Sequence, residues 1–408
     1  MPIGYLVSTS LIATVVVLAV VRHNPPRSSP FRLRSAVGFL LNWPSVVICL
    51  LVASTALAIA QSGVGSPVFW LGFGLALVAT VGLVILRQRT LGTGPAVERA
   101  LTEGLGADWR ERVDAGFAAR LRTRPLARIL FAPVARRRAV ERIANIRYGP
   151  AGSRNLLDLY RHRTHPSGCR TLIYLHGGAF RFGSKRIGAR SLLYRLASEG
   201  WVCVSANYRL LPSGRFPDPL IDAKKVIAWV REHGRDYGAD PATVFVAGSS
   251  AGGHLASLAA LTPNDPGLQP GFEGTDTSVT GAITLYGYYG SVAADSPSPR
   301  DSAEQSAPPF FVVHGDQDTL VIVDDARSFV ERLRARSSSP VVYAELPGAE
   351  HGFDLFRSRR FETVIDAIEA FAAWVAGGAA ESGAAEVGYP TTARRGAGAV
   401  ERGGLENR

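Results

Sequence analysis

Lysine and cysteine are both scarce in this chain of 408 residues. The three cysteines, Cys49, Cys169 and Cys203, form neither a CxxC motif nor the spacing of a disulfide framework. Their positions therefore argue against a fold held together by disulfide bonds. We expect all three to be small buried hydrophobic residues, which suits a protein of a reducing compartment.

Arginine carries almost all of the positive charge. Lysine and arginine together number 45 against 34 aspartates and glutamates, which gives a net charge of +11, and the only lysines are Lys185, Lys224 and Lys225. A basic balance suits either nucleic acid or an anionic membrane surface. The chain lacks zinc-finger spacing, an RNP-like string and a basic-zipper heptad, so nucleic acid is not an expected partner.

Motifs that bind metal ions or nucleotides are missing as well. The sequence has no H-E-x-x-H or similar ligand cluster, no Walker P-loop and no dinucleotide-binding G-x-G-x-x-G. We therefore expect neither a metal ion nor an organic cofactor.

Long apolar runs, by contrast, are abundant near the start of the chain. Hydrophobic residues make up 47% and the mean hydropathy is +0.10, which is high for a purely soluble protein. Residues 3–21, 37–60 and 67–86 carry no charge, and each run approaches the roughly 20 residues that span a bilayer as a helix. We predict three transmembrane helices within residues 1–86. The alternative for the first run is a cleaved signal peptide, although it lacks a basic n-region and a small-residue cleavage site.

The arginines around these runs predict an orientation. Four of them follow the first run, at positions 22, 27, 32 and 34, whereas the loop between the second and third runs, QSGVGS, has no charge. Arg87 and Arg89 follow the third run directly. The positive-inside rule then places the N-terminus outside and everything after residue 87 in the cytoplasm. The expected location is the plasma membrane, with several spans.

Two further segments look unlike a folded core. Residues 87–145 read as a basic connector, whose stretch RTRPLARILFAPVARRRAVERI mixes arginine with apolar residues. This stretch suits either an anionic membrane surface or a cap helix with a solvated face. Residues 377–408 are rich in glycine and alanine with scattered charge, and we predict a disordered tail there.

Between these segments, residues 146–376 alternate short β-rich runs with helical stretches. This alternation predicts an α/β fold with a mostly parallel sheet covered by helices on both faces. The expected strands are 171–178, 201–210, 243–250, 281–289, 309–316 and 341–348. The expected helices are 188–199, 219–236, 251–261, 323–336 and 361–376.

A serine stands where one of these strands turns into a helix. Residues 248–252, Gly-Ser-Ser-Ala-Gly, fit the pattern G-x-S-x-G. In this pattern the glycines let strand and helix pass closely while Ser250 is held in a strained turn with its Oγ exposed. The following helix start offers free N–H groups and a partial positive charge to a developing oxyanion. A tight packing turn without chemistry is the alternative.

An early glycine-rich loop offers the second half of such an oxyanion hole. The sequence YLHGGAF covers residues 174–180 and follows a predicted strand. The N–H groups of Gly177, Gly178 and Ala251 are the candidate donors, because glycine lets the backbone approach a substrate. Without Ser250 nearby, the same HGG would be an ordinary turn.

The order of these motifs resembles the α/β-hydrolase superfamily, in particular its hormone-sensitive-lipase-like and carboxylesterase branch. The resemblance rests on YLHGGAF, on NYRLLPSGRFPDPLIDAKKVIAWV at 207–230 and on YGADPATVFVAGSSAGGHLASLA at 237–259. It covers about residues 145–376 and leaves the apolar runs and the basic connector outside. It implies an α/β-hydrolase fold for that region, and the transmembrane region predicted from the apolar runs precedes it.

The resemblance also implies an acid and a base after the serine. In the segment VVHGDQDTLVIVDDA the family pattern falls on Asp318, with Asp316 as the second candidate. In LPGAEHGF it falls on His351. The implied triad is Ser250, Asp318 and His351, with His351 taking the serine proton. Asp324 and Asp325 stand at a predicted helix start, where acidic residues are common.

The expected function is therefore a membrane-anchored serine hydrolase that cleaves carboxylic esters through an acyl-enzyme intermediate. Its expected partners are a small-molecule or lipid ester and the membrane itself. Two alternatives remain open at this point. The same triad could serve an amidase, an arylformamidase or a peptidase, or the domain could be an inactive binding scaffold.

Overall fold

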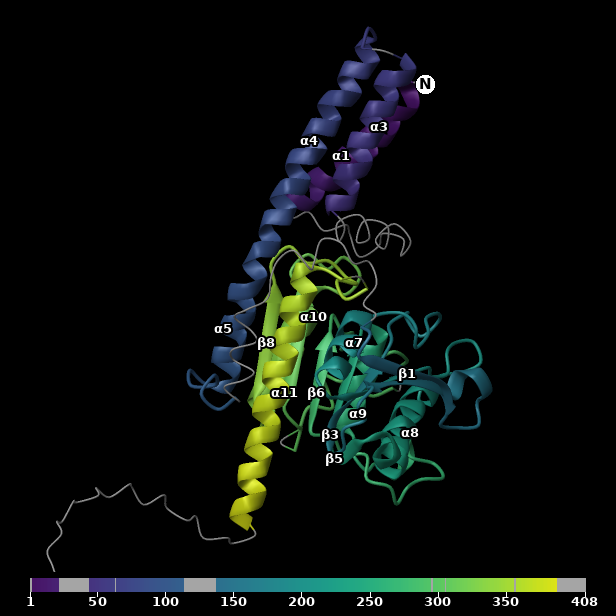
Figure 1. Ribbon diagram of the computed structural model, residues 1–408, viewed down its shortest axis with the longest axis vertical. Coiled ribbons are helices and arrows are strands. Elements are labelled where there is room, and N and C mark those ends of the chain that lie inside the picture. The colour runs from purple at the N-terminus through teal and green to yellow at the C-terminus, as the bar shows by residue number, and fades with distance from the viewer. Residues whose placement is uncertain are drawn as a thin grey trace, which may run out of the picture.

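The computed structural model describes residues 2–21, 44–62, 64–113, 137–294, 296–304, 306–355 and 357–386. Three apolar helices, α1 (Pro2–Val20), α3 (Pro44–Ser62) and α4 (Pro67–Arg89), lie side by side at one end of the molecule (Figure 1). We call them the helical bundle. Small residues let them pack closely: an added Cβ on Gly72 would lie 2.9 Å from the Tyr5 ring. The Tyr5 hydroxyl also lies 2.8 Å from Thr55 Oγ1.

Two described helices are long and apolar enough to cross a membrane by length and composition, Ile3–Val20 and Pro67–Leu105. The helix over Val46–Gln61 is apolar but shorter. The predicted second span began at residue 37, and its first part, up to residue 43, lies outside the described residues. Membrane crossing therefore stays a prediction.

The bundle leads directly into the rest of the fold. Helix α4 continues through η1 (Thr90–Gly92) into α5 (Thr93–Leu105), which packs on strand β8 and helix α11. An added Cβ on Gly104 would lie 2.7 Å from Val342 Cγ2, so the helix touches the sheet closely. Part of the predicted connector 87–145 is thus a covering helix of the α/β domain, which differs from the expected division.

The α/β domain, residues 137–386, is built on one eight-stranded sheet in the order β1-β2-β4-β3-β5-β6-β7-β8. Strands β3 to β8 are parallel, whereas β2 pairs antiparallel with both β1 and β4. The strands are β1 (Val140–Arg147), β2 (Leu156–His162), β3 (Cys169–Leu175), β4 (Val202–Ala206), β5 (Ala239–Ser249), β6 (Gly281–Leu285), β7 (Phe310–Gly315) and β8 (Val341–Leu346). The six predicted strands are all present, and the antiparallel pair β1 and β2 was not predicted.

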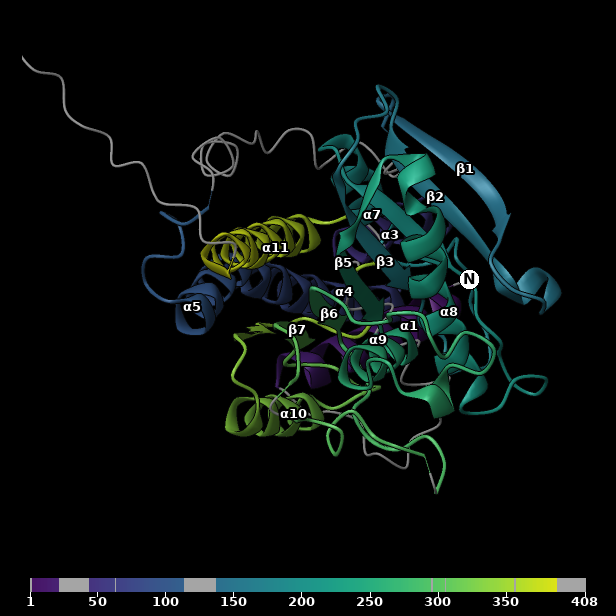
Figure 2. The ribbon, with the colours of Figure 1, turned by 90° about the horizontal axis from the view of Figure 1, so that it is seen from below.

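Helices cover both faces of this sheet, as predicted (Figure 2). On one face lie α5, α7 (Arg190–Ser198) and α11 (Arg359–Glu386), and on the other lie α8 (Asp218–His233), α9 (Ala251–Leu261) and α10 (Val323–Arg336). Three short 3₁₀ helices complete the domain, η3 (Gly152–Asn155), η4 (Gly234–Tyr237) and η5 (Pro266–Leu268). Each buried strand feeds both cores: in β3, Tyr174 joins the first core and Ile173 the second.

The C-terminal boundary also differs from the expectation. The predicted tail began at residue 377, but α11 continues to Glu386. Residues 387–408, and residues 122–136 of the basic stretch, lie outside the described residues. The expected roles of those segments stay predictions.

Candidate active site

Ser250 lies at the turn between β5 and α9. Its backbone has φ 54° and ψ −119°, a positive-φ conformation that a residue other than glycine adopts only when its surroundings enforce it. Its N–H donates to Leu285 O at 3.0 Å, and its carbonyl accepts from His254 N–H at 3.0 Å. These two bonds attach the turn to the neighbouring strand β6 and to the new helix.

The glycines around Ser250 are required by close backbone approach. A Cβ on Gly248 would overlap the backbone of Gly252, and a Cβ on Gly252 would overlap the carbonyl oxygens of Leu175 and His176. Gly252 therefore lets α9 start directly against the end of β3. This is the steric reason for G-x-S-x-G at this turn.

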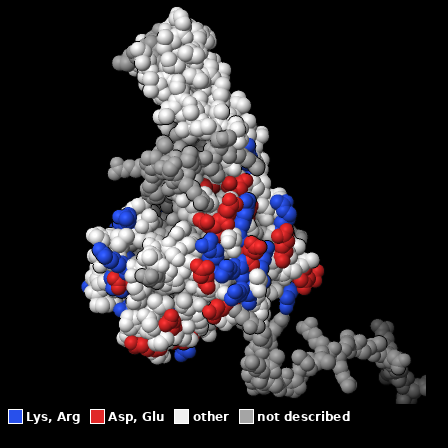
Figure 3. All heavy atoms as spheres, turned by 180° about the vertical axis from the view of Figure 1, so that it is seen from behind, with Lys and Arg blue, Asp and Glu red and all other residues white. Residues whose placement is uncertain are grey.

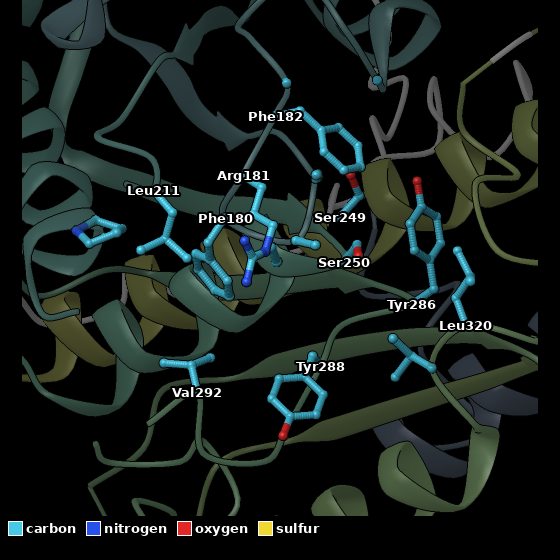
Figure 4. A pocket seen from close by; sticks show the side chains of 18 of the residues that line it. Phe180, Arg181, Phe182, Leu211, Ser249, Ser250, Tyr286, Tyr288, Val292 and Leu320 are labelled. Atoms are coloured by element: carbon cyan, nitrogen blue, oxygen red, sulfur yellow. The ribbon is translucent and has the colours of Figure 1, made fainter. Parts of the chain in front are cut away.

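A cavity of about 900 Å³ opens beside this turn. Its lining includes Ser250, Ala251 and His351 together with the glycine-rich loop that follows β3. Figure 4 shows Ser250 between Phe182, Tyr286 and Tyr288, with Leu211 and Val292 farther out. The volume lies in the range of small-molecule sites, and most of the wall is apolar.

The glycine-rich loop follows the cavity wall in an unusual backbone conformation. Gly178 has φ 134°, and an added Cβ there would collide with the carbonyl of Phe182. Ala179 and Phe180 also have positive φ values, 50° and 58°. The loop is held by Leu211 N–H, which donates to Phe180 O at 2.7 Å. An ideal Cβ on Gly177 would lie 3.1 Å from Ser250 Cβ, so this loop and the serine are direct neighbours.

His176, the first residue of the HGG motif, supports the loop from behind. Its ring stacks on Tyr208 with centroids 4.4 Å apart, and its Nδ1 lies 2.8 Å from Gly177 O. Burial lowers the pKa of His176 to about 4, which keeps the ring neutral near pH 7. A neutral imidazole with one N–H can donate that proton to Gly177 O.

His351 and Asp318 form a hydrogen-bonded pair. His351 Nδ1 lies 2.7 Å from Asp318 Oδ2, and Asp318 Oδ1 accepts the N–H groups of Leu320 and Val321, each at 2.8 Å. His314 Nε2 lies 3.3 Å from Asp318 Oδ2 and 2.9 Å from Val321 O. Burial by itself would raise the pKa of Asp318, but the charge of His351 and the hydrogen bonds from both histidines outweigh burial, and the pKa lies well below its usual value.

Asp316 and Glu350 lie close to this pair but contact other groups. Asp316 Oδ1 accepts the Gly348 N–H at 2.7 Å, on the loop that leads to His351. Glu350 is buried and accepts Thr319 N–H at 3.2 Å and His351 N–H at 3.3 Å. Burial and the neighbouring Asp318 charge raise the pKa of Glu350 well above its usual value. Of the two candidate acids, the structure brings Asp318 to the His351 ring.

The sequence did not predict a buried hydrogen-bond network of tyrosine and aspartate side chains that adjoins the site. Asp354 Oδ2 accepts Tyr174 OH at 2.9 Å and Ala189 N–H at 3.0 Å, and Asp354 Oδ1 accepts Tyr286 OH. Tyr174 OH also lies 2.7 Å from Ser249 Oγ. The Tyr286 ring lies 4.4 Å from the His351 ring, so the network reaches the site. The only signal in the sequence was the position of Asp354, three residues after His351.

Within the part of the chain that the structure describes, no group of three or more His, Cys, Asp or Glu side chains is arranged to hold a metal ion. The predicted residues lie instead as a serine at a strained turn, a partly exposed histidine paired with a buried carboxylate, and two sets of backbone N–H groups. That set of groups is chemically able to carry out acyl transfer.

Known proteins resemble this chain over the same region. A family model described as BD-FAE matches residues 157–296, and the model of the dienelactone hydrolase family matches residues 271–376. The probable carboxylic ester hydrolase LipM of Mycobacterium tuberculosis is 38% identical over 76% of this chain and 78% of its own length. Esterase LipQ of the same organism is 38% identical over 69% of this chain and 76% of its own length. Among solved structures, the apo form of Thermogutta terrifontis esterase 2 aligns with 62% of this chain and 96% of its own, at a TM-score of 0.46 and 24% identity.

Proposed function

Because this chain belongs to the α/β-hydrolase superfamily, among its hormone-sensitive-lipase-like esterases, and is a carboxylic ester hydrolase, we propose that Ser250, His351 and Asp318 are its catalytic triad. The observation that carries the proposal is the 2.7 Å hydrogen bond between His351 and Asp318 beside the cavity that Ser250 lines. Ser250 is the nucleophile, His351 the general base and Asp318 the group that fixes the imidazole tautomer.

The reaction we propose has two acyl-transfer steps. Ser250 Oγ attacks the ester carbonyl while His351 takes the hydroxyl proton, and His351 then gives this proton to the departing alcohol. The acyl group stays on Ser250 until a water molecule, deprotonated by His351, attacks the acyl-enzyme. The acyl–Oγ bond then breaks, His351 returns the proton to Ser250 Oγ, and the acid is released. The low pKa of Asp318 keeps this carboxylate charged while the imidazolium forms.

The oxyanion of each tetrahedral intermediate needs hydrogen-bond donors placed in advance. We propose the N–H groups of Gly177, Gly178 and Ala251 for this role. Ala251 is the first residue of α9, where the N–H groups at the helix start have no intrahelical acceptor. The positive φ values of the loop and its closeness to Ser250 support the other two donors.

Membrane anchoring is also part of the proposal. Helices α1, α3 and α4 contain no charged residue except Arg87 and Arg89 in the last turn of α4, and Figure 3 shows an almost uncharged bundle surface next to a charged α/β domain. The arginine distribution favours the cytoplasmic side for this domain. Protease digestion of inverted and right-side-out membrane vesicles tests this orientation, since a cytoplasmic domain is cleaved only in inverted ones.

The ester assignment is tested with matched substrates. The full chain in detergent is given p-nitrophenyl esters from acetate to palmitate and the corresponding p-nitroanilides. We expect ester hydrolysis to dominate and to vanish in Ser250→Ala. The control variant is Ser257→Ala, which removes a buried hydroxyl bonded to Gly253 O at 2.9 Å within α9. Faster hydrolysis of anilides than of esters would favour the amidase alternative.

A further inference from the structure

The loop that carries His351 touches the base of the helical bundle. The Arg89 guanidinium at the end of α4 donates to Val20 O at 2.8 Å and to Ala19 O at 3.4 Å, at the end of α1. On its other side, Arg89 Cβ lies 2.9 Å from the position of an ideal Cβ on Gly348. Pro347 Cγ lies 3.3 Å from the position of an ideal Cβ on Gly92. Arg89 thus joins the bundle to the loop between β8 and His351.

This contact fixes which edge of the sheet faces the bundle. Ser250, Asp318 and His351 all follow the carboxyl ends of parallel strands, β5, β7 and β8. That edge lies toward α1, α3 and α4, while α5 and α11 run from it along the sheet (Figure 1). The candidate active site therefore lies on the bundle side of the domain.

The exposed apolar side chains of the α/β domain gather at the same place. Within its described residues, the large hydrophobic side chains that are exposed are Phe182 (54%), Ile187 (50%) and Leu355 (42%). All three line the cavity. Scattered exposed apolar residues are ordinary, but exposed apolar side chains confined to a cavity mouth mark a surface that contacts something apolar. We call these three residues the apolar rim.

The loop that carries Phe182 and Ile187 of the apolar rim is also positively charged. The loop 177–190 carries Arg181, Lys185, Arg186 and Arg190 and no acidic residue. Lys185 is buried against Asp158, whereas the three arginines are exposed. Apolar side chains next to arginine form the surface that binds at the headgroup region of an anionic membrane.

We propose that the cavity opens onto the membrane that holds the bundle, and that its substrates are lipophilic esters dissolved in that membrane. Such an ester would leave the leaflet past the apolar rim and reach Ser250 without crossing bulk water. This inference rests on the proposed membrane anchoring and deepens the proposed esterase function by naming its substrate class. A protein partner or a second copy of the chain on the apolar rim is the competing occupant.

The test measures how deep the apolar rim sits, independently of catalysis. Cys49 is exposed, contrary to the expectation that all three cysteines are buried, whereas Cys169 and Cys203 are buried. In a Cys49→Ser background, Ile187→Cys is therefore labelled with bimane and placed in nanodiscs that contain anionic lipid. Lipids with a nitroxide near the top of the acyl chain are the quencher. The matched control is Arg235→Cys, an exposed position in η4, which precedes the amino end of β5 at the opposite edge of the sheet.

We expect strong quenching at position 187 and none beyond background at position 235. Equal quenching at the two positions would overturn the proposal. Quenching at position 187 that rises with protein concentration and does not require the nitroxide lipid would also overturn it. Hydrolysis of p-nitrophenyl acetate is measured separately on the unlabelled Cys49→Ser protein in the same nanodiscs, because a label at position 187 would itself occupy the cavity mouth. Loss of hydrolysis with quenching intact would contradict the esterase mechanism alone, whereas quenching lost with hydrolysis intact would contradict the membrane-facing mouth alone.

A second arm concerns the substrate. In Leu355→Ser we expect hydrolysis of a long-chain ester embedded in vesicles to fall about tenfold relative to the wild type, after division by the rate with a water-soluble ester. An unchanged ratio would contradict delivery of the substrate past the apolar rim.

Discussion

His351 Nδ1 lies 2.7 Å from Asp318 Oδ2, and the second oxygen of Asp318 is held by two backbone N–H groups. The carboxylate is thus fixed by the chain itself and in turn fixes the orientation of the imidazole ring. The proton exchange with Ser250 that the mechanism requires then falls to the other ring nitrogen, Nε2.

The acid assignment predicts unequal effects at two neighbouring aspartates. Asp318→Asn leaves a side chain of the same shape that no longer stabilises the imidazolium, so we expect kcat to fall by about 10²–10⁴-fold. Asp316→Asn alters the contact with Gly348 and the charge near Arg360, neither of which involves the His351 ring, and we expect less than about a tenfold loss. Ester hydrolysis by the purified full chain measures both. A larger loss for Asp316→Asn would reverse the assignment.

The oxyanion loop predicts a steric effect that a glycine elsewhere does not share. Gly178 (φ 134°) and Gly200 (φ 92°) both have positive φ, so alanine should cost roughly 1–2 kcal/mol of backbone strain at either position. Only at Gly178 would the new Cβ also collide, with the carbonyl of Phe182, whereas nothing lies within 4 Å at Gly200. We expect Gly178→Ala to lose about 10²-fold or more in kcat and Gly200→Ala to keep its activity. Similar kcat values in the two variants would rule out this role for the loop.

The buried network predicts a link between Tyr286 and activity. Tyr286→Phe removes the donor to Asp354 Oδ1, and leaving a buried acceptor unpaired should cost about 1–3 kcal/mol of unfolding free energy. Because the Tyr286 ring contacts His351, we also expect a several-fold fall in kcat and little change in KM. The control is Tyr289→Phe, which breaks a buried 2.7 Å contact with Thr284 away from the site. If both variants lose stability and neither loses activity, the network is structural only.

A cluster of charges between α7 and α11 predicts that the free energy of unfolding depends on pH. The buried Arg195 contacts Glu362, Asp366 and Glu369, and burial raises the pKa of Glu369 from 4.5 to about 7 despite the charge of Arg195. The folded protein then binds this proton more tightly than the unfolded chain. The resulting stability is present below pH 4.5 and is lost as the pH rises through about 7.

Glu369→Gln should therefore remove that part of the pH dependence. We expect the wild type to lose on the order of 2 kcal/mol between pH 4.5 and 7.5 from this group, and the variant to lose none of it. Thermal unfolding of the full chain in detergent at several pH values measures the difference. Glu331→Gln, on the exposed side of α10, is the control and should retain the wild-type profile. An identical pH profile for Glu369→Gln and the wild type would contradict the prediction.

Local patterns predicted the centre of the sheet well. Strands β4, β6 and β7 are buried at every position and β3 at all but one, because helices cover both of their faces, and their largely apolar runs are visible without knowledge of the tertiary fold. The turn at Ser250 was predictable because Gly248 and Gly252, which the close backbone approach requires, form the local pattern G-x-S-x-G with it. The hydrogen bond between His351 and Asp318 joins residues that the family resemblance had already singled out.

The elements outside the centre of the sheet were harder to predict, for physical reasons. Strand β1 has one buried position, Val140, and carries three charges in eight residues, so its sequence resembles the basic connector before it. The position of helix α5 is set by contacts with β8 and α11, which are far away in sequence and therefore not visible in a local pattern. Asp354 is recognisable as a network residue only once Tyr174 and Tyr286 are brought beside it by β3 and the end of β6.

The most direct test of the account is to trap the acyl-enzyme. The full chain is mixed with a p-nitrophenyl ester, quenched in acid within the first turnover and digested, and the peptides are analysed by mass spectrometry. We predict an acyl group on Ser250, a burst of p-nitrophenol equal to the enzyme concentration, and loss of both in Ser250→Ala. Steady hydrolysis by Ser250→Ala at the wild-type rate, or an acyl group on another residue, would contradict the proposed mechanism.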